Sequence, residues 1–237
     1  ESDKHGRLYV EESDEEFWSL PFLQELASLP AVQRLKNVGF LGAIEFLQFG
    51  NGSEPHRRRH NRFEHSVGVA KLALAYARAR SLDFSTTKTL VAGALLHDIG
   101  HGPLSHTLEA IFEERFGLNH HTVGNRLITG NHPSGRELHH FLLAHDVDPD
   151  EIVALLSGTA QHPYSFLFSS PVNLDTIEGI TRSRYFATSW SASPPAVLIV
   201  KALAEETTRT KMLDAFWGLK DAVYRVLIHS RTGIVMD

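Results

Sequence analysis

Hydrophobic positions recur at helical spacing along most of the chain, and few segments alternate as strands do. The stretch 63–80 has the pattern of a mostly buried helix, and the stretch 86–96 is apolar nearly all round, which is typical of a helix at the centre of a protein. Prolines and glycines separate the helical stretches from one another. The pattern predicts an all-α fold, a multi-helix bundle whose other helices lie at 22–26, after Pro30, and at 105–116, 122–129, 135–144, 150–156, 197–206 and 212–227.

A histidine and an aspartate follow the most apolar predicted helix. His97 and Asp98 come directly after the run 90–96, and Gly100 then supplies a residue at which helices commonly end. Neighbours on a helix point about 100° apart, so these two can bind one cation only where the helix is ending. An imidazole with a carboxylate suits a borderline or hard divalent ion that keeps positions open for water and substrate. The alternative is a plain helix C-terminus, with His97 on the helix dipole and Asp98 as a solvated cap.

Two further residues extend this pair to a complete donor set. His65 falls in the first turns of the 63–80 helix, and Asp175 falls at the start of a later predicted helix, where it could also be an ordinary first-turn carboxylate. Donors from three helices form a four-ligand, open-sided site inside a helical bundle. We therefore predict a metal site in the centre of the bundle, with His65, His97, Asp98 and Asp175 as its ligands.

Two longer motifs surround these residues. The segments 61–69 (NRFEHSVGV) and 96–106 (LHDIGHGPLSH) resemble the HD superfamily of metal-dependent phosphohydrolases, and within it the deoxynucleoside triphosphate triphosphohydrolases. The segments 3–6, 33–35 and 223–229 resemble that branch as well, so the similarity covers most of the chain. The resemblance implies one divalent ion (Fe, Mn, Ni, Zn or Mg), with room for a second metal. It also implies cleavage of a deoxynucleoside triphosphate to deoxynucleoside and triphosphate by metal-activated water.

The resemblance also implies roles for other residues. It makes His101, His106, Glu109 and His121 catalytic and Arg62, Gln33 and Arg182 substrate-binding. The sequence supports one of these pairs independently, because His106 and Glu109 are three apart on a predicted helix and share a face, where the carboxylate can fix the imidazole tautomer. Periodicity does not decide which of His120 and His121 points inward. Only the match of residues 121–124 to the family selects His121.

Three positions after Asp175 depart from the family pattern. Relatives carry a basic residue, a tyrosine and an acid where this chain has Thr176, Gly179 and Ser183, at positions that contact the sugar and phosphates. This leaves two alternatives open. One is an HD-type phosphatase or phosphodiesterase acting on another nucleotide or phosphoester, with His101 and His121 around a second metal. The other is a regulatory module that binds a nucleotide without cleaving it.

Composition sets the remaining expectations. The 237 residues carry a net charge of -5 and no cysteine, which excludes disulfides, thiolate metal sites and a cysteine nucleophile. No apolar run is long enough to span a membrane, and no basic footprint indicates nucleic acid, although the run 56–62 could be a phosphate-facing lip or a solvated loop. We expect a cytoplasmic protein that forms one domain over residues 1–237, with a motif core at about 56–185 and a C-terminal helical extension at about 194–237. We also expect a homo-oligomer, and the aromatic stripe of Phe216, Trp217 and Tyr224 would lie either at its interface or in the core.

Overall fold

The computed structural model describes residues 17–42, 60–158, 162–183, 195–205, 209–227 and 229. Within these ranges the only β pairing is an isolated bridge between Gly39 and Asn61, and the all-α prediction is confirmed. Several segments used in the sequence argument lie outside the described residues, namely 3–6, 56–59 and most of the stretch after residue 227.

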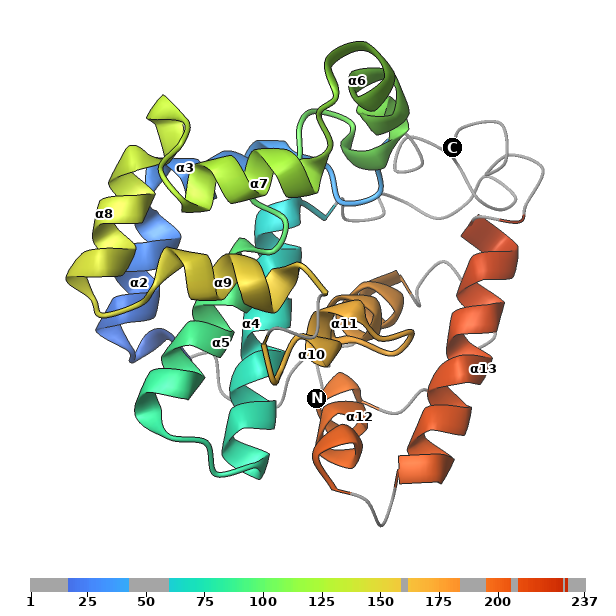
Figure 1. Cartoon of the computed structure of the whole chain (residues 1–237). Coiled ribbons are helices and arrows are strands. Elements are labelled where there is room, and N and C mark those ends of the chain that lie inside the picture. The colour runs from blue at the N-terminus through green and yellow to red at the C-terminus, as the bar shows by residue number, and fades with distance from the viewer. Residues whose placement is uncertain are drawn as a thin grey trace, which may run out of the picture.

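Two adjacent helices form the centre of the molecule. Helix α4 (Arg62–Ala79) and helix α5 (Phe84–Leu96) pack side by side and are buried over most of their length (Figure 1). Each begins at a side-chain cap: Asn61 accepts a hydrogen bond from the Glu64 amide, and Asp83 accepts one from the Thr86 amide. Other helices cover this pair on several sides. This position explains why both helices carry apolar residues on more than one face.

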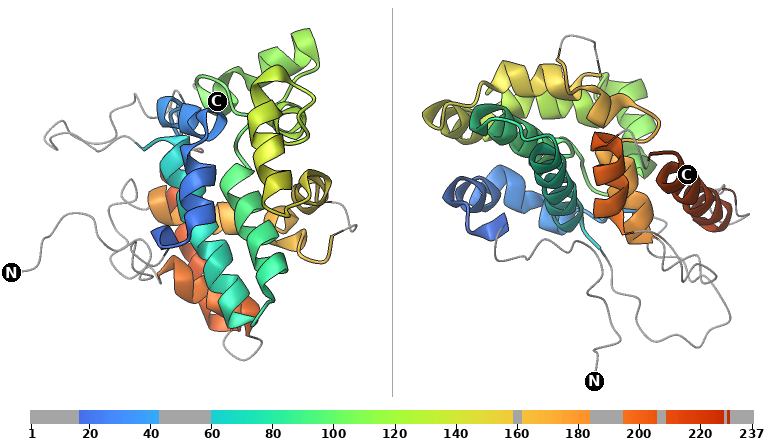
Figure 2. Two further views of the ribbon diagram at one scale, coloured as in Figure 1. Left: turned by 90° about the vertical axis from the view of Figure 1, so that its left-hand side faces the viewer. Right: turned by 90° about the horizontal axis from the view of Figure 1, so that it is seen from below.

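The remaining helices enclose this pair. Figure 2 shows α2 (Pro21–Ser28) and α3 (Pro30–Gln33) on one side of α4 and α5, with α7 (His120–Ile128), α8 (Arg136–Ala144) and α9 (Pro149–Leu156) on the other. A third group consists of α10 (Phe166–Ser169), α11 (Leu174–Ser183), α12 (Ala196–Ala204) and α13 (Arg209–Leu227). Helices α11 and α12 pack against α4, α13 packs on α11 and α12, and α10 packs on α9 and α11. Short 3₁₀ turns lie at Arg34–Asn37, Ser105–Leu108 and Pro133–Gly135, and α6 (Glu109–Phe116) projects at one end of the molecule (Figure 1).

The segment after Asp98 differs from its prediction. The helix expected at 105–116 is a 3₁₀ turn followed directly by α6. Leu104 and Ser105, where the turn begins, have φ angles of 62° and 48°, in the left-handed region. The helix expected from residue 122 begins at His120 instead. Asn119 forms a capping box there with Thr122, so two residues missing from the predicted helix are in fact its first turn.

The C-terminal aromatic stripe divides between two environments. Phe216 is fully buried against the core, whereas Trp217 and Tyr224 are 44% and 37% exposed on the outer side of α13. The predicted homo-oligomer and the single-domain boundaries stay predictions. In the described part of the chain, none of the helices combines the length and apolarity that a membrane span requires.

Candidate metal centre and active site

Four donor groups from three helices meet where α4, α5 and α11 come together. His65 lies on α4, His97 and Asp98 end α5, and Asp175 lies in the first turn of α11. His65 Nε2 lies 3.3 Å from His97 Nε2, 2.9 Å from Asp175 Oδ1 and 3.6 Å from Asp98 Oδ2. His97 Nε2 lies 3.5 Å from Asp98 Oδ2 and 3.8 Å from Asp175 Oδ1. Donors that bind one ion at about 2.0–2.2 Å are themselves about 3–3.5 Å apart. The donors of His65, His97 and Asp98, all within 4.8 Å of one another, are thus spaced for a shared divalent cation, and Asp175 lies beside both imidazoles.

The two imidazoles are each oriented by a hydrogen bond at Nδ1. His97 Nδ1 donates to the Ala94 carbonyl at 2.8 Å, and His65 Nδ1 donates to Glu178 Oε2 at 2.5 Å. A donor bond at Nδ1 places the lone pair on Nε2 and fixes the ring orientation, as is usual for metal-binding histidines. Burial opposes a charge on His65, but Glu178 and Asp175 outweigh it and raise the pKa of His65 to about 9. The surroundings of this imidazole therefore favour positive charge.

The site is closed on most sides and open beside Asp175. The side chains of His65, Asp98 and His97 are 0%, 5% and 9% exposed, whereas that of Asp175 is 48% exposed. An ion bound here would reach solvent past Asp175. This is the pattern of a catalytic site, which keeps a coordination position for water or substrate, rather than of a closed structural site.

Glu178 supports His65 and is itself held by Arg182. The Arg182 guanidinium donates to both Glu178 oxygens, with Nε at 3.0 and 3.1 Å, and its Nη2 also donates to the Glu64 carbonyl at 2.9 Å. All of these groups are buried except Glu64, and a Cβ at Gly68 would overlap with Glu178 Oε1. Arg182 was predicted to bind substrate, and its side chain is directed instead to this carboxylate. Its substrate role stays a prediction.

Asp98 is held in the same way by Arg62. Arg62 Nη1 donates to Asp98 Oδ2 at 2.7 Å, and its Nε donates to the Ser105 hydroxyl, which donates in turn to the Gly39 carbonyl. Burial would raise the pKa of Asp98, but Arg62 and the neighbouring imidazoles hold it well below its ordinary value. Asp98 is therefore an anion, as a metal ligand must be. The predicted contact of Arg62 with phosphate stays a prediction, because this side chain is buried against Asp98.

A second cluster of histidines adjoins the first through Asp98. His101 Nε2 lies 3.3 Å from Asp98 Oδ1 but is not aligned for a hydrogen bond. The His101 ring stacks on that of His120, with centroids 4.1 Å apart, and meets His106 edge-on at 4.6 Å. Burial lowers the pKa of His101 to about 4, so this imidazole is neutral near pH 7.

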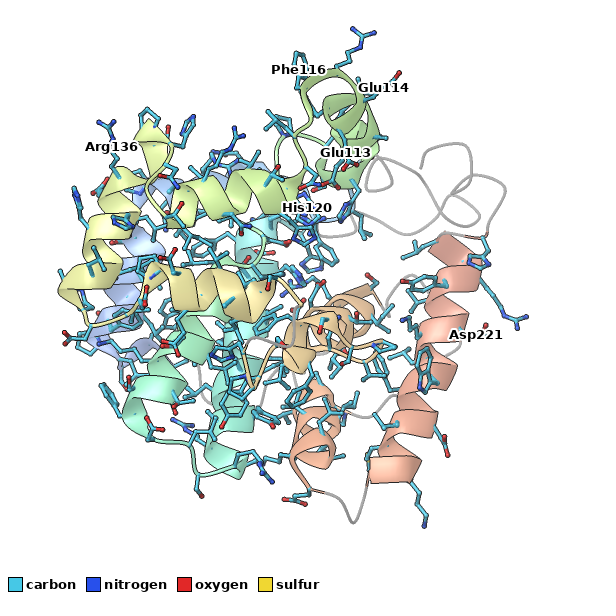
Figure 3. The ribbon with its side chains drawn as sticks, in the orientation of Figure 1. Glu113, Glu114, Phe116, His120, Arg136 and Asp221 are labelled. Atoms are coloured by element: carbon cyan, nitrogen blue, oxygen red, sulfur yellow. The ribbon has the colours of Figure 1, made fainter. Side chains whose placement is uncertain are left out.

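Glu109 joins two rings of this cluster. Its Oε2 lies 2.8 Å from His106 Nδ1, and its Oε1 accepts from both the backbone amide and Nδ1 of His120. Burial would raise the pKa of Glu109, but the hydrogen bonds from His120 and His106 lower it to about 2. The sequence-based pairing of His106 with Glu109 agrees with this geometry. His120, which lies where the start of α7 meets α6 (Figure 3), is a cluster member that periodicity could not identify.

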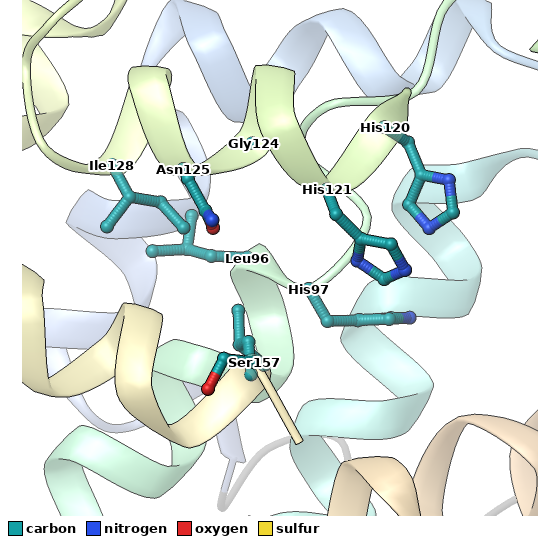
Figure 4. A pocket seen from close by; sticks show the side chains of 9 residues that line it. Leu96, His97, His120, His121, Gly124, Asn125, Ile128 and Ser157 are labelled. Atoms are coloured by element: carbon teal, nitrogen blue, oxygen red, sulfur yellow. The ribbon is translucent and has the colours of Figure 1, made fainter. Parts of the chain in front are cut away.

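His121 has a different environment. It is exposed, and its ring lies beside His97 at one end of a cavity of about 270 Å³ (Figure 4). The donor atoms of His101, His106 and His120, in contrast, all lie within 4.8 Å of one another, so a second metal would find its donors there rather than at His121. The catalytic role of His121 stays a prediction.

Two further positions that the family resemblance links to substrate, Gln33 and Gly179, also make contacts with other residues of the protein. Gln33 Nε2 donates to the Ala27 carbonyl at 2.6 Å, which leaves its predicted contact with a sugar hydroxyl untested. Gly179 lies under Phe40, whose ring covers His65 with centroids 4.6 Å apart, and a Cβ at Gly179 would lie 3.3 Å from Phe40 Cζ. The glycine that replaces the family tyrosine is thus explained locally, because Phe40 occupies the adjoining space.

Comparison with known proteins identifies this arrangement. Residues 62–156, which contain His65, His97 and Asp98, match the family model described as HD domain. The match covers about two fifths of the chain, so this part of the protein resembles an HD domain. The His and Asp donors around α4 and α5 are candidate ligands for a divalent metal.

The HD-domain relatives are longer than this chain. The uncharacterized protein YwfO of Bacillus subtilis is 28% identical over 183 residues, which cover 75% of this chain and 38% of that protein. The uncharacterized protein MG461 of Mycoplasma genitalium is 29% identical over 173 residues, covering 70% of this chain and 39% of the relative. Deoxynucleoside triphosphate triphosphohydrolase SAMHD1 of Danio rerio is 38% identical over 100 residues, or 39% of this chain and 15% of the relative. The chain therefore spans about two fifths of the length of the two bacterial relatives.

Proposed function

We propose that this HD domain hydrolyses phosphate esters of nucleotides, and that its substrates are deoxynucleoside triphosphates, cleaved to deoxynucleoside and triphosphate. The observation that carries the proposal is the position of Asp98. One of its oxygens lies beside the donor atoms of His65 and His97, and the other lies beside His101 in the second cluster. Groups that bind a cation and groups that transfer protons are thus within reach of one carboxylate, as hydrolysis of a phosphate ester requires.

The proton-transferring group on this side is His106. Its Nδ1 is held by the Glu109 carboxylate, so Nε2 of this half-exposed imidazole is free to take a proton from water or give one to a leaving oxygen. Glu109 stays anionic, and its hydrogen bond to Nδ1 fixes the tautomer and orientation of the imidazole. A divalent ion held by His65, His97, Asp98 and Asp175 would supply Lewis acidity, which acidifies water and offsets phosphate charge. In the proposed hydrolysis water is the nucleophile, so no side chain of the protein needs to form a covalent intermediate.

The choice of substrate rests on similarity rather than on contacts. The relative SAMHD1 is a deoxynucleoside triphosphate triphosphohydrolase, and the matched region of the Danio rerio protein is 38% identical. A second candidate is hydrolysis of another nucleotide or phosphoester. Thr176, Gly179 and Ser183 favour it, because Ser183 is buried and Gly179 lies under Phe40 where substrate-contacting side chains stand in the triphosphohydrolases.

The test is a product analysis with metal-loaded protein. The four deoxynucleoside triphosphates, the ribonucleoside triphosphates and nucleoside monophosphates are incubated separately with Mn²⁺, Mg²⁺, Fe²⁺, Ni²⁺ or Zn²⁺, and products are resolved by chromatography. His97→Ala and Asp98→Ala remove metal ligands, and His140→Ala, at an exposed histidine of α8, is the matched control.

Deoxynucleoside plus triphosphate, absent in the two ligand variants and retained in His140→Ala, is the expected result. Orthophosphate as the sole inorganic product would select the second candidate. Binding without turnover with every metal would contradict both and favour a regulatory module.

A further inference from the structure

A cavity opens from the metal donors along one face of α7. Its walls are the end of α5, the end of α9 and the residues of α7 that recur every turn (Figure 4). His97 and His121 stand at one end of this cavity. The rest is lined by Leu96, Gly124, Asn125, Ile128, Leu156 and Ser157.

The aliphatic part of this cavity offers no cationic side chain to a phosphate. None of its lining residues is lysine or arginine. His120 and His121 begin α7 at the end of the cavity nearest the metal donors (Figure 4). The phosphate of a substrate belongs at that end.

One polar side chain stands in the otherwise aliphatic part. Leu96 and Ile128 are buried and Leu156 is half-buried, so they offer an apolar surface. Within the described residues the Asn125 side-chain amide makes no hydrogen bond, and Figure 4 shows it directed into the cavity. An amide presents a donor and an acceptor side by side, which matches the edge of a planar heterocycle.

The size of the cavity agrees with part of a substrate. Its volume of about 270 Å³ is below the range of about 300–1,000 Å³ for pockets that enclose a whole drug-sized ligand. We propose that this cavity binds the uncharged heterocycle of the phosphorylated substrate, with Asn125 hydrogen-bonded to its edge and Ile128 packed against its face. The inference rests on the proposed function, because it assumes that the substrate's phosphate lies at the metal donors.

Binding of deoxynucleosides tests the cavity without any turnover. The four deoxynucleosides are titrated into metal-loaded wild-type protein and into Asn125→Leu, Ile128→Phe and Arg126→Ala, with affinity measured by calorimetry. Asn125→Leu keeps the side-chain size and removes the amide, Ile128→Phe fills the cavity, and Arg126→Ala changes the exposed neighbour on α7 as the matched control.

We expect at least one deoxynucleoside to bind the wild type, to bind Asn125→Leu about tenfold more weakly and to bind Arg126→Ala as the wild type does. Ile128→Phe should abolish binding, and if that variant does not fold, Asn125→Leu decides alone. Equal affinity in Asn125→Leu and wild type, or no binding to wild type, overturns the inference. Failure of the proposed function is a separate result, namely the absence of phosphate-ester cleavage, whereas cleavage with an unchanged KM in Asn125→Leu overturns the cavity assignment only.

Discussion

At the scale of single residues, the site depends on side chains that orient others. Glu178 touches no substrate in the proposed function, yet it accepts a hydrogen bond from His65 Nδ1 and its charge is balanced by Arg182. The sequence signal for it was present, because Glu178 is three residues after Asp175 and so shares a face of α11. That spacing alone could not show that Glu178 would accept a hydrogen bond from His65.

Replacing Glu178 by glutamine should weaken divalent-metal binding about 10- to 100-fold, because the amide no longer makes His65 as strong a donor. Metal affinity measured by calorimetry on the purified variant checks this. Glu114→Gln, on the exposed side of α6 (Figure 3), should bind metal as the wild type does. Equal affinity in Glu178→Gln and wild type would show that the carboxylate only stabilises the fold.

His106 and Glu109 should act as a unit in turnover. We expect His106→Ala to lower kcat about 10²- to 10⁴-fold, the range for loss of a general acid or base, while metal affinity changes little. Glu109→Gln should lower kcat less, and the double variant should be no slower than His106→Ala, because Glu109 acts through that imidazole. Kinetics of the three variants decide this, and additive losses would mean independent roles.

At the scale of elements, the placement of α7 sets the second cluster. The backbone of residue 100 passes so close to α7 that a Cβ at Gly100 would overlap with the His120 carbonyl oxygen and lie 2.6 Å from the Gly124 nitrogen. Sequence inspection assigned Gly100 to the end of α5. The structure shows a further reason for glycine, which is the close approach of two backbones.

Gly100→Ala should destabilise the protein by about 1–3 kcal/mol or more, because α7 must move away from the residues that follow Asp98. Gly124→Ala is the matched control, since its Cβ would meet neighbours at 3.6–3.9 Å, an ordinary contact distance. An alanine there should be neutral or stabilising by up to about 1 kcal/mol, because glycine is unfavourable inside a helix. Denaturant unfolding measures both, and equal stability of the two variants would contradict the close packing.

At the scale of the whole molecule, the four donors connect helices that are far apart in the chain. An ion bound by them would join α4, the end of α5 and α11 in the folded state only, since the unfolded chain does not bring these residues together. Metal binding should therefore be linked to global stability.

Saturating divalent metal should raise the free energy of unfolding by about 2.7 kcal/mol at 100 times the Kd, and a chelator should reverse the gain. Thermal unfolding with and without metal tests this. His97→Ala should lose the response, and His140→Ala should keep it. A shift that persists in His97→Ala would place the stabilising ion elsewhere.

Local features of the sequence were enough to predict the all-α class, the two central helices and the resemblance to HD motifs. These depend on local properties: apolar periodicity, capping residues and short contiguous motifs around His65 and His97. The helix at 105–116 was predicted less well, since it begins as a 3₁₀ turn and Leu104 and Ser105 have positive φ angles that the preferences of these residues do not indicate. In the structure Ser105 is hydrogen-bonded to Arg62 and Gly39. Only the tertiary structure brought His120, rather than His121, to Glu109 and His101, and Glu178 to His65. Contacts between residues far apart in sequence depend on how helices pack. The pattern of residues within one segment does not show which other segment packs against it.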